Sequence, residues 1–325
     1  MTARSDNLAS NERKRRMDLE AAFEALAQGQ HLKEIDVDLS VRAELAEYGV
    51  RFEKGVPIPH PTGFLSSAKI KAHLNESTRN WLHQLDVLSC TQSTNTDLLE
   101  LSRDSDINGR VRTAEVQTGG RGRRGRQWVS PFAKNVALSV GISIDRSTTE
   151  IGSISLAIGL MVAQVLDGLE IEDVSLKWPN DILIDQRKVG GILIELADAQ
   201  RPASLVVGIG MNVNDAPGVE VTGSYRATRI VDHSASCSRN SLVAHLINAV
   251  HDAIRRFEDF GFEPFKEGWK RRDFLRGRNI LLAGSEPSIS GIGAGIDDEG
   301  AYLIKTSTGV ERAIGGELSL RIADV

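Results

Sequence analysis

The sequence predicts an α+β protein with a small helical N-terminal region, a mixed α/β centre and a small all-β C-terminal end. Apolar residues recur at helical spacing near the N-terminus. From about Trp81, strand-like runs alternate with helical runs, and after Arg276 only short strands separated by turn residues remain. These three observations define the expected architecture.

The chain has 325 residues, which is too long for one ordinary hydrophobic core. We expect a polar tail over residues 1–16, a small domain over 17–78, a central domain over 79–272 and a β-barrel over 273–325. Three prolines between Pro57 and Pro61 predict a linker near residue 60.

The small N-terminal domain is expected to contain two helices. Leu19, Phe23 and Leu26 recur near helical spacing within Met17–Gln28, and Val41–Tyr48 predicts a second helix. The region has the size of a minimal domain.

The central domain is expected to combine strands with two long helices. Val136–Ile144 alternates apolar and small residues, which predicts a strand with one buried face. Ile154–Leu169 is apolar nearly all round and predicts a buried helix. A last helix, with apolar residues spaced from Leu242 to Phe257, ends before Gly261. Further strands are predicted at Val174–Lys177, Ile182–Ile184, Val189–Leu196 and Leu205–Met211, with a tight turn at Asp185–Gln186.

The short strands and regularly spaced turns of the C-terminal segment are typical of a small β-barrel. Its clearest strands are Ile280–Leu282, Ala301–Ile304 and Leu318–Ile322, and turn signals occur at Asp297–Gly300 and Thr308–Gly309.

The composition excludes several classes of protein. Hydrophobic residues make up 41% and charged residues 26%, and the net charge of -5 provides no global positive field for nucleic acid. Cys90 and Cys237 have no Cys or His neighbour at ligand spacing, which excludes a disulfide framework and a structural zinc site. The sequence shows no signal peptide and no run long enough to cross a membrane, so we expect a cytoplasmic protein.

The strongest chemical signal is the run Gly119–Arg126, called here the glycine–arginine loop. Its four glycines and four arginines disfavour both a helix and an interior strand. We expect a mobile cationic loop whose guanidinium groups bind phosphate or carboxylate.

Two other interpretations of the loop are weaker. The spacing Gly120-x-Gly122-x-x-Gly125 matches the dinucleotide-binding fingerprint, but a strand follows it instead of a helix. Arg-Gly segments that bind nucleic acid usually repeat through disordered sequence, whereas this run occurs once within an ordered-looking domain.

Two further groups of polar and charged residues are candidates for a binding site. Lys177–Asp181 and Arg187–Leu193 place charged side chains at the ends of a predicted hairpin, where a lysine can meet charge on a transferring phosphoryl group. Gly190 and Gly191 indicate either a bulge or room for a ligand. In Gln92–Asn95, Ser93 or Thr94 is expected to cap a helix or to bind a small polar group.

Taken in order, these clusters resemble the biotin protein ligases of the BirA type. The matching motifs are Ser93–Asn95, Gln117 with Gly120–Trp128, Lys177–Asp181, Arg187–Leu193, Gly210–Asn214 and the closing Gly315–Arg321. The resemblance covers about residues 80–325, and the glycine–arginine loop followed by Lys-Trp-Pro-Asn-Asp is highly specific. It implies a catalytic domain of the biotin/lipoate ligase type and a small SH3-like β-barrel.

The resemblance implies an ATP-dependent ligase. In this family, biotin and ATP with Mg²⁺ form biotinyl-5′-AMP and pyrophosphate. Biotin is then transferred to a lysine of a biotin carboxyl carrier domain, as in acetyl-CoA carboxylase. The magnesium ion would arrive with ATP and would not sit in a protein cage.

The resemblance also implies roles for individual residues. Arg121, Arg123 and Lys188 would be catalytic, because they would cancel the repulsion between two anionic reactants. Biotin would be held by Ser93, Thr94, Asn95, Gln117, Gly120, Arg121, Lys188 and Gly191. The nucleotide would be held by Arg123, Arg124, Arg126, Trp128, Lys177, Asn180, Asp181, Asn212 and Arg321.

The N-terminal region departs from the repressor-type members, which carry a winged helix-turn-helix there. The span between Leu26 and Phe52 is short for two more helices and a wing, and Glu34, Asp36 and Asp38 make it acidic. We therefore expect residues 17–78 to form a reduced or diverged winged helix that does not bind DNA.

Three alternatives stay open on the sequence alone. A lipoate ligase shares the central fold and the adenylation chemistry, although Trp128 and the β-rich C-terminal segment favour biotin. A biotin-sensing repressor would bind duplex DNA with steep salt dependence, and a non-catalytic scaffold would not need the arginines and Lys188 together. An exposed strand edge could pair with a second copy, so a homodimer is left open.

Overall fold

The computed structural model describes most of the chain. The described residues are 18–28, 39–53, 56–57, 63–129, 131–147, 151–216, 226–234, 237–283, 288–314 and 319–322. The predicted polar tail over residues 1–16 and most of the predicted linker near residue 60 lie outside these ranges.

A seven-stranded mixed sheet forms the centre of the molecule, in the order β3-β4-β5-β9-β8-β7-β6. Only β3 and β4 are parallel, and each other neighbouring pair is antiparallel. The strands are β3 Gln84–Leu88, β4 Arg110–Ala114, β5 Val136–Ile144, β6 Val174–Lys177, β7 Asp181–Ile184, β8 Arg187–Asp198 and β9 Ala203–Met211. The predicted strands of this region are confirmed. The tight turn is confirmed too, because Asp185 and Gln186 both have positive φ, as the turn of a two-residue hairpin requires.

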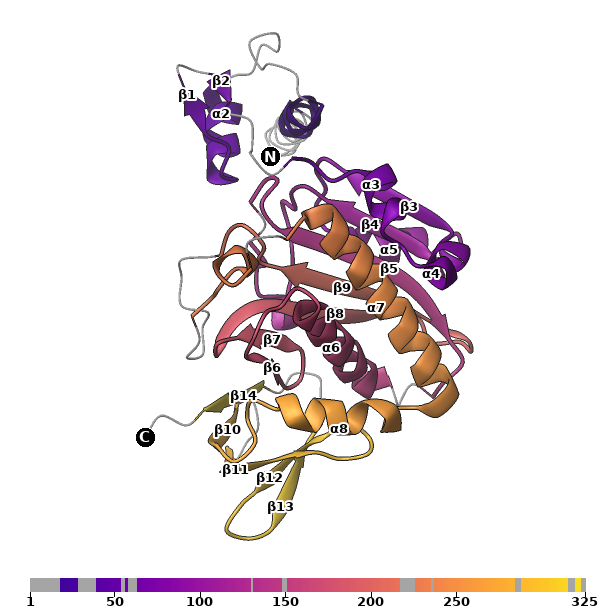
Figure 1. Cartoon of the computed structure of the whole chain (residues 1–325), viewed down its shortest axis with the longest axis vertical. Coiled ribbons are helices and arrows are strands. Elements are labelled where there is room, and N and C mark those ends of the chain that lie inside the picture. Colours follow the sequence, from indigo (N-terminus) through magenta and orange to yellow (C-terminus); the bar gives the residue numbers. More distant parts are fainter. Residues whose placement is uncertain are drawn as a thin grey trace, which may run out of the picture.

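Helices cover both faces of this sheet. Figure 1 shows α6 (Ile151–Asp167) and α7 (Arg239–Phe260) side by side across one face. The shorter helices are α3 Ser67–Ala72, α4 Glu76–Trp81, α5 Thr94–Leu101 and α8 Glu263–Arg272. Alternate residues of β9 identify the two faces: Leu205 and Val207 belong to the main core, whereas Val206 packs with Leu98 of α5.

The prediction that Val136–Ile144 has one buried face is wrong. Every residue of β5 except Ser143 is buried, because α7 packs on the strand from one side and α5 from the other. The alternating pattern arose from Ala137, Ser139 and Gly141. Ser139 contacts Thr94 and Asn95 of α5, and a Cβ on Gly141 would lie 2.2 Å from the Ile107 carbonyl oxygen, so a close neighbour requires small residues at these two positions. Small residues on the second face therefore indicated a second covered surface.

The C-terminal segment is a five-stranded antiparallel sheet in the order β13-β12-β11-β10-β14. Its strands are β10 Asn279–Ala283, β11 Ile289–Ile296, β12 Tyr302–Lys305, β13 Val310–Ala313 and β14 Ser319–Ile322. Tyr302 and Ile304 join the same apolar core as the central domain. Trp178, 2% exposed, donates its indole N–H to the Gly300 carbonyl at 3.1 Å. This contact attaches the β6–β7 hairpin to the C-terminal sheet.

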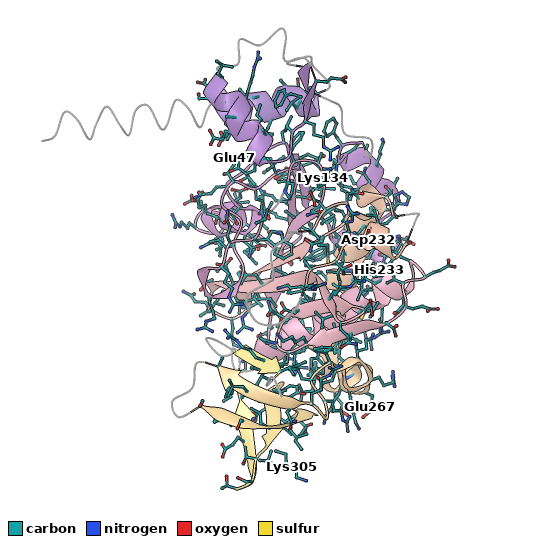
Figure 2. All side chains as sticks on the ribbon, turned by 90° about the vertical axis from the view of Figure 1, so that its left-hand side faces the viewer. Glu47, Lys134, Asp232, His233, Glu267 and Lys305 are labelled. Carbon is teal, nitrogen blue, oxygen red and sulfur yellow. The ribbon has the colours of Figure 1, made fainter. Side chains whose placement is uncertain are left out.

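The N-terminal region packs on the opposite end of the central domain, so the molecule is elongated (Figures 1 and 2). Residues 18–27 are helical and are followed by α2 (Leu39–Glu47) and a hairpin of β1 (Phe52–Glu53) and β2 (Val56–Pro57). Phe23 packs against Phe132 of the central domain, with ring centroids 5.0 Å apart and the rings tilted by 31°. Within the described residues, no helix is both long and apolar enough to span a membrane.

Asp273, at the C-terminal end of α8, sits in the junction between the central domain and the C-terminal sheet. Its carboxylate accepts hydrogen bonds from the Leu275 amide at 3.0 Å and the Tyr302 hydroxyl at 2.9 Å. Burial raises the pKa of this carboxyl from 3.8 to about 6, although both hydrogen bonds oppose the rise. The carboxyl therefore binds a proton more tightly in the folded state than in the unfolded state.

We expect Asp273→Asn to flatten the dependence of stability on pH. Because the pKa is raised on folding, the favourable contribution of Asp273 is complete below pH 3.8 and is lost as the pH rises through about 6. The asparagine side chain carries no charge, so the variant avoids this loss. Its free energy of unfolding, relative to that of the wild type, should therefore rise by about 2–3 kcal/mol between pH 4 and pH 7.5. Urea unfolding at several pH values measures this difference. Asp259→Asn, which removes an exposed carboxylate of α7, is the control, and parallel profiles for Asp273→Asn and the wild type would contradict the prediction.

Candidate active site

A cavity of about 520 Å³ lies on the α5 side of the central sheet. Its walls come from the start of α5, the glycine–arginine loop, strands β5, β8 and β9, the β6–β7 hairpin and the C-terminal strand β14. The structure brings sixteen of the seventeen predicted site residues into this lining. They are Ser93, Thr94, Asn95, Gln117, Arg121, Arg123, Arg124, Arg126, Trp128, Lys177, Asn180, Asp181, Lys188, Gly191, Asn212 and Arg321.

Gly120 is the predicted site residue outside the lining. It is buried at the base of the loop, where its carbonyl accepts a hydrogen bond from the Trp128 amide at 2.9 Å. A Cβ at this position would lie 2.7 Å from the Trp128 carbonyl oxygen and 2.9 Å from Gln117 Nε2. Glycine is needed here because the two ends of the loop and the Gln117 side chain meet at this point.

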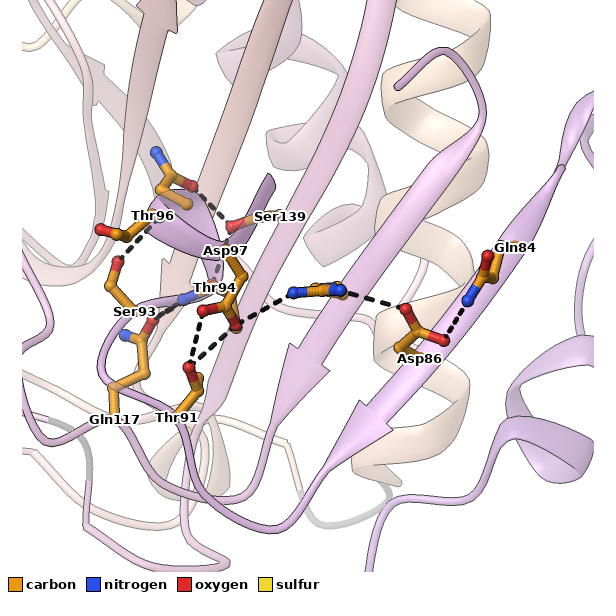
Figure 3. A network of polar contacts seen from close by, with 11 residues as sticks. Gln84, Asp86, Thr91, Ser93, Thr94, Thr96, Asp97, Gln117 and Ser139 are labelled. Atoms are coloured by element: carbon orange, nitrogen blue, oxygen red, sulfur yellow. Dashed lines mark hydrogen bonds and ion pairs between the residues drawn. The ribbon is translucent and has the colours of Figure 1, made fainter. Parts of the chain in front are cut away.

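The polar wall of the cavity is built at the N-terminus of α5 (Figure 3). Ser93 caps the helix, as predicted, by accepting a hydrogen bond from the Thr96 amide. Gln117 Oε1 accepts hydrogen bonds from both the amide and the hydroxyl of Thr94, at 2.8 and 3.1 Å. Ser139 of β5 lies behind them, with its Oγ 2.7 Å from Thr94 Oγ1 and 2.5 Å from Asn95 Oδ1. The wall is thus a connected set of donors and acceptors held by buried neighbours.

The glycine–arginine loop has the irregular backbone that its composition predicted. Residues Arg123–Gly125 form a single 3₁₀ turn, in which Arg124 and Gly125 have positive φ. The Gly122 amide donates to the Arg126 carbonyl at 2.7 Å, which closes the loop on itself. The strand β5 follows, so the resemblance to a dinucleotide-binding fingerprint is accidental.

A cluster of cations gathers around one carboxylate at the β6–β7 end of the cavity. Lys188 Nζ lies 2.6 Å from Asp181 Oδ1, and the two side chains are 19% and 22% exposed. Burial lowers the pKa of Lys177, and the nearby Lys188 and Arg126 lower it further. Burial alone would raise the pKa of Asp181, but Lys188 and Lys177 outweigh it and lower the value. The cluster carries excess positive charge, which suits a polyanionic ligand.

Trp128 covers β9 just beyond the loop. A Cβ on Gly210 would lie 2.5 Å from Cε2 of the Trp128 ring, so the indole rests directly on the glycine backbone. Among the described residues, Trp128 Nε1 and Asn212 Oδ1 are buried in this structure without a hydrogen-bond partner. Both residues line the cavity, and such atoms are ones that a polar ligand can satisfy.

Sequence reasoning missed several residues that shape the cavity. Gly208 lies under Asn95, because a Cβ there would be 2.4 Å from Asn95 Oδ1. Ser139 and Glu195 stand behind the polar wall and contact residues that line it. The alternating glycines of β9 and the small residues of β5 were the available signals, since close approach of another side chain requires them.

The arrangement suits the joining of two anions. A polar wall with donors and acceptors can hold a neutral polar group, and the cations can bind a carboxylate beside a phosphate. The aromatic ring of Trp128 can pack against a base. Because the polar wall and the cation cluster line one cavity, two ligands held by them would lie close together.

Comparison with known proteins agrees with this chemistry. The biotin/lipoate A/B protein ligase family matches residues 87–212. The bifunctional ligase/repressor BirA of Escherichia coli is 33% identical over 273 residues, covering 83% of both chains. The biotin–[acetyl-CoA-carboxylase] ligase of Mycobacterium tuberculosis is 34% identical over 244 residues, covering 73% of this chain and 88% of that protein.

A solved structure supports the same assignment. The biotin protein ligase of Aquifex aeolicus in complex with biotin and ATP superposes with a TM-score of 0.63 at 28% identity, covering 74% of this chain and all of that one. The family match over residues 87–212 includes most of the residues that line the cavity. The chain therefore belongs to the biotin/lipoate A/B protein ligase family and is an enzyme of its biotin protein ligase group.

Proposed function

We propose that this enzyme forms biotinyl-5′-AMP from biotin and ATP and then transfers biotin to a lysine of a biotin carboxyl carrier domain. The observation that carries the proposal is that one cavity combines the Thr94–Gln117 polar wall with the Lys188–Asp181 cation cluster. The wall suits an uncharged polar ring, and the cluster suits a carboxylate next to a triphosphate. The names of the related ligases agree with these two substrates.

The polar wall would hold biotin. The side-chain oxygen of Gln117 accepts hydrogen bonds from Thr94, so the amide nitrogen of Gln117 is the atom that can donate to a ligand. We assign biotin to Ser93, Thr94, Asn95, Gln117, Arg121, Lys188 and Gly191, with Gly120 acting indirectly by leaving room for the Gln117 amide. A Cβ at Gly191 would approach Lys188 Nζ to 3.5 Å, so the glycine also makes room for the lysine.

The cation cluster would hold the nucleotide and lower the barrier to attack. A carboxylate and an α-phosphate repel one another, and Arg121, Arg123 and Lys188 can compensate both charges in a partly buried site. We assign the nucleotide to Arg123, Arg124, Arg126, Trp128, Lys177, Asn180, Asp181, Asn212 and Arg321. Arg123 donates to Asn180 Oδ1 at 3.4 Å, which connects the loop to the β6–β7 hairpin.

Asp181 is the one carboxylate among the described residues that line the cavity. Magnesium is usually bound by one or two carboxylates together with phosphates and waters. This donor set therefore fits an ion carried in by the triphosphate, which would neutralise part of the phosphate charge.

We expect Gly210→Ala to raise the KM for ATP about tenfold, a change of ~1.4 kcal/mol. The new methyl group would lie 2.5 Å from the Trp128 ring, so the indole must leave β9. The KM for biotin should change little, because the polar wall lies at α5. Steady-state kinetics with each substrate measures the two effects.

Gly152→Ala is the matched control, because a Cβ at that exposed position of α6 meets no atom within 4 Å. It should leave both KM values unchanged. An unchanged KM for ATP in Gly210→Ala, with a shifted tryptophan fluorescence, would show that the position of Trp128 does not matter for the nucleotide.

The activity is tested by incubating the purified protein with biotin, ATP and Mg²⁺ and analysing the products by mass spectrometry. Biotinyl-5′-AMP, followed by a biotinylated lysine after addition of a carrier domain, supports the proposal. Lipoate is offered in a parallel reaction. A folded protein that makes no biotinyl adenylate, or an adenylate only with lipoate, contradicts it.

The proposal does not extend to DNA binding. In the described helices of the N-terminal region, α2 carries Arg42 but also Glu44 and Glu47, and residues 18–27 include Asp18, Glu20 and Glu24. This acidic character disfavours contact with phosphates.

A further inference from the structure

Glu195 on β8 links two parts of the site that the sequence keeps apart. Its Oε2 accepts a hydrogen bond from Asn95 Nδ2 at 2.7 Å, and its Oε1 lies 3.5 Å from Arg121 Nη2. Asn95 belongs to the start of α5 and Arg121 to the glycine–arginine loop. One half-buried carboxylate, 25% exposed at the side chain, therefore contacts both the polar wall and the loop.

The contact with Arg121 fastens the loop. Arg121 Nη2 also donates to Thr96 Oγ1 at 3.0 Å, so the guanidinium is held between α5 and β8. Arginine has five N–H donors, so this attachment leaves others for a ligand carboxylate. On its other side the loop is attached to the β6–β7 hairpin through Arg123 and Asn180.

The contact with Asn95 determines which way the polar wall points. Because the Glu195 carboxylate can only accept, the Asn95 amide nitrogen must face it, and Asn95 Oδ1 then faces Ser139. Ser139 in turn contacts Thr94, and Thr94 donates to Gln117. A carboxylate outside the cavity lining thus sets the donor and acceptor pattern that the wall presents to its ligand.

Asn95 cannot easily adopt another position. The Asn95 amide lies directly over Gly208, where a Cβ would approach Oδ1 to 2.4 Å. A turned amide would place a nitrogen against the Ser139 hydroxyl and an oxygen against Glu195. The charge of Glu195 makes the turned state costly, since two acceptors would face one another.

We propose that Glu195 is a positioning residue for biotin binding, which orients the Asn95–Ser139–Thr94–Gln117 wall and anchors the glycine–arginine loop through Arg121. The inference rests on the proposed function of the cavity. It assigns to one carboxylate the coupling between the shape of the biotin wall and the placement of the loop. Glu195 acts through Asn95 and Arg121 and does not itself touch the ligand.

The test compares Glu195→Gln with Glu172→Gln, which makes the same change at an exposed position before β6. The first readout is biotin binding by calorimetry without ATP. We expect the Kd of Glu195→Gln to rise by about tenfold or more, the scale of losing a charge-assisted contact. The Tm should stay close to wild type, which a general loss of structure would not allow.

The second readout needs no activity. Trypsin cleaves after arginine, and the loop contains four of them, so limited proteolysis followed by mass spectrometry reports how firmly the loop is held. We expect cleavage between residues 121 and 126 of ligand-free Glu195→Gln to be severalfold faster than in wild type and in Glu172→Gln. A saturating biotin concentration should slow it.

Arg121→Ala and the double variant complete the design. If the two residues act together, the double variant should weaken biotin binding by less than the sum of the two single effects, because the shared contact is lost only once. Glu195→Gln with wild-type biotin affinity and wild-type loop cleavage would overturn the inference. If the wild type itself fails to bind biotin, the proposed function fails, while the cleavage comparison still decides whether Glu195 anchors the loop.

Discussion

Replacing Lys188 by alanine is expected to lower the rate of biotinyl-5′-AMP formation by about 10²–10³-fold, the cost of losing one group that stabilises developing charge. Lys188 Nζ lies in the cavity 2.6 Å from Asp181 Oδ1 and is 19% exposed at the side chain. Few solvent molecules can replace its charge there, so the barrier should rise more than for a surface lysine. Single-turnover production of the adenylate, followed by mass spectrometry, measures the effect.

Lys188→Ala should lower the rate constant of the chemical step more than it weakens the binding of biotin or ATP. If Lys188 acts mainly as the reacting charges change, the Kd values for biotin and ATP should shift less than the rate constant does. Lys305→Ala is the control, because Lys305 is an exposed lysine of the C-terminal sheet that does not line the cavity; Figure 2 shows it near the end of the molecule opposite the N-terminal region. Near-normal adenylation by Lys188→Ala would remove Lys188 from the catalytic residues.

Replacing Arg239 by methionine is expected to lower the free energy of unfolding by about 3–5 kcal/mol, the range for breaking a buried ion pair. Arg239 Nη1 lies 2.6 Å from Glu115 Oε2, and both side chains are only 2% exposed. Arg239 also donates to the Gly63 carbonyl at 2.8 Å. Methionine would leave the Glu115 carboxylate and this carbonyl buried without their partner, which explains the expected size.

The double variant Arg239→Met with Glu115→Gln should be more stable than Arg239→Met alone. The amide of glutamine is neutral, and its oxygen can still accept the hydrogen bond that Glu115 receives from the Leu65 amide. Urea unfolding of both variants tests this, with Arg103→Met as an exposed control. A cost below about 1 kcal/mol for Arg239→Met would show that the pair behaves like a surface salt bridge.

Periodicity predicted the regular elements of the central domain well. The bounds of β5 and β6 match the predicted strands, and α7 ends at Gly261 because that residue adopts a φ of +66°. Periodicity failed for β3 and β4, where charged and apolar residues mix over five positions each. These strands lie toward one edge of the sheet, so they need fewer apolar residues than the buried strands.

The site was predictable in part because its ligand-facing residues are chemically unusual. Arginines among glycines, and a lysine beside a tight turn, have no simple structural use, so they stood out. Glu195 did not stand out, because a glutamate near the end of a strand resembles an ordinary surface charge. Its importance arises from contacts with residues 74 and 100 positions away in the chain, Arg121 and Asn95.

The sequence alone determined the order of the three regions, most strands and helices of the central domain, and the residue types that line the cavity. These follow from local spacing and from side-chain chemistry, which are properties of neighbouring residues. Tertiary structure alone decided that both faces of β5 are covered, that Trp128 rests on Gly210, and that Glu195 joins Asn95 to Arg121. Each of these depends on distances between residues far apart in the chain, and such distances exist only after the sheet has brought its strands into register.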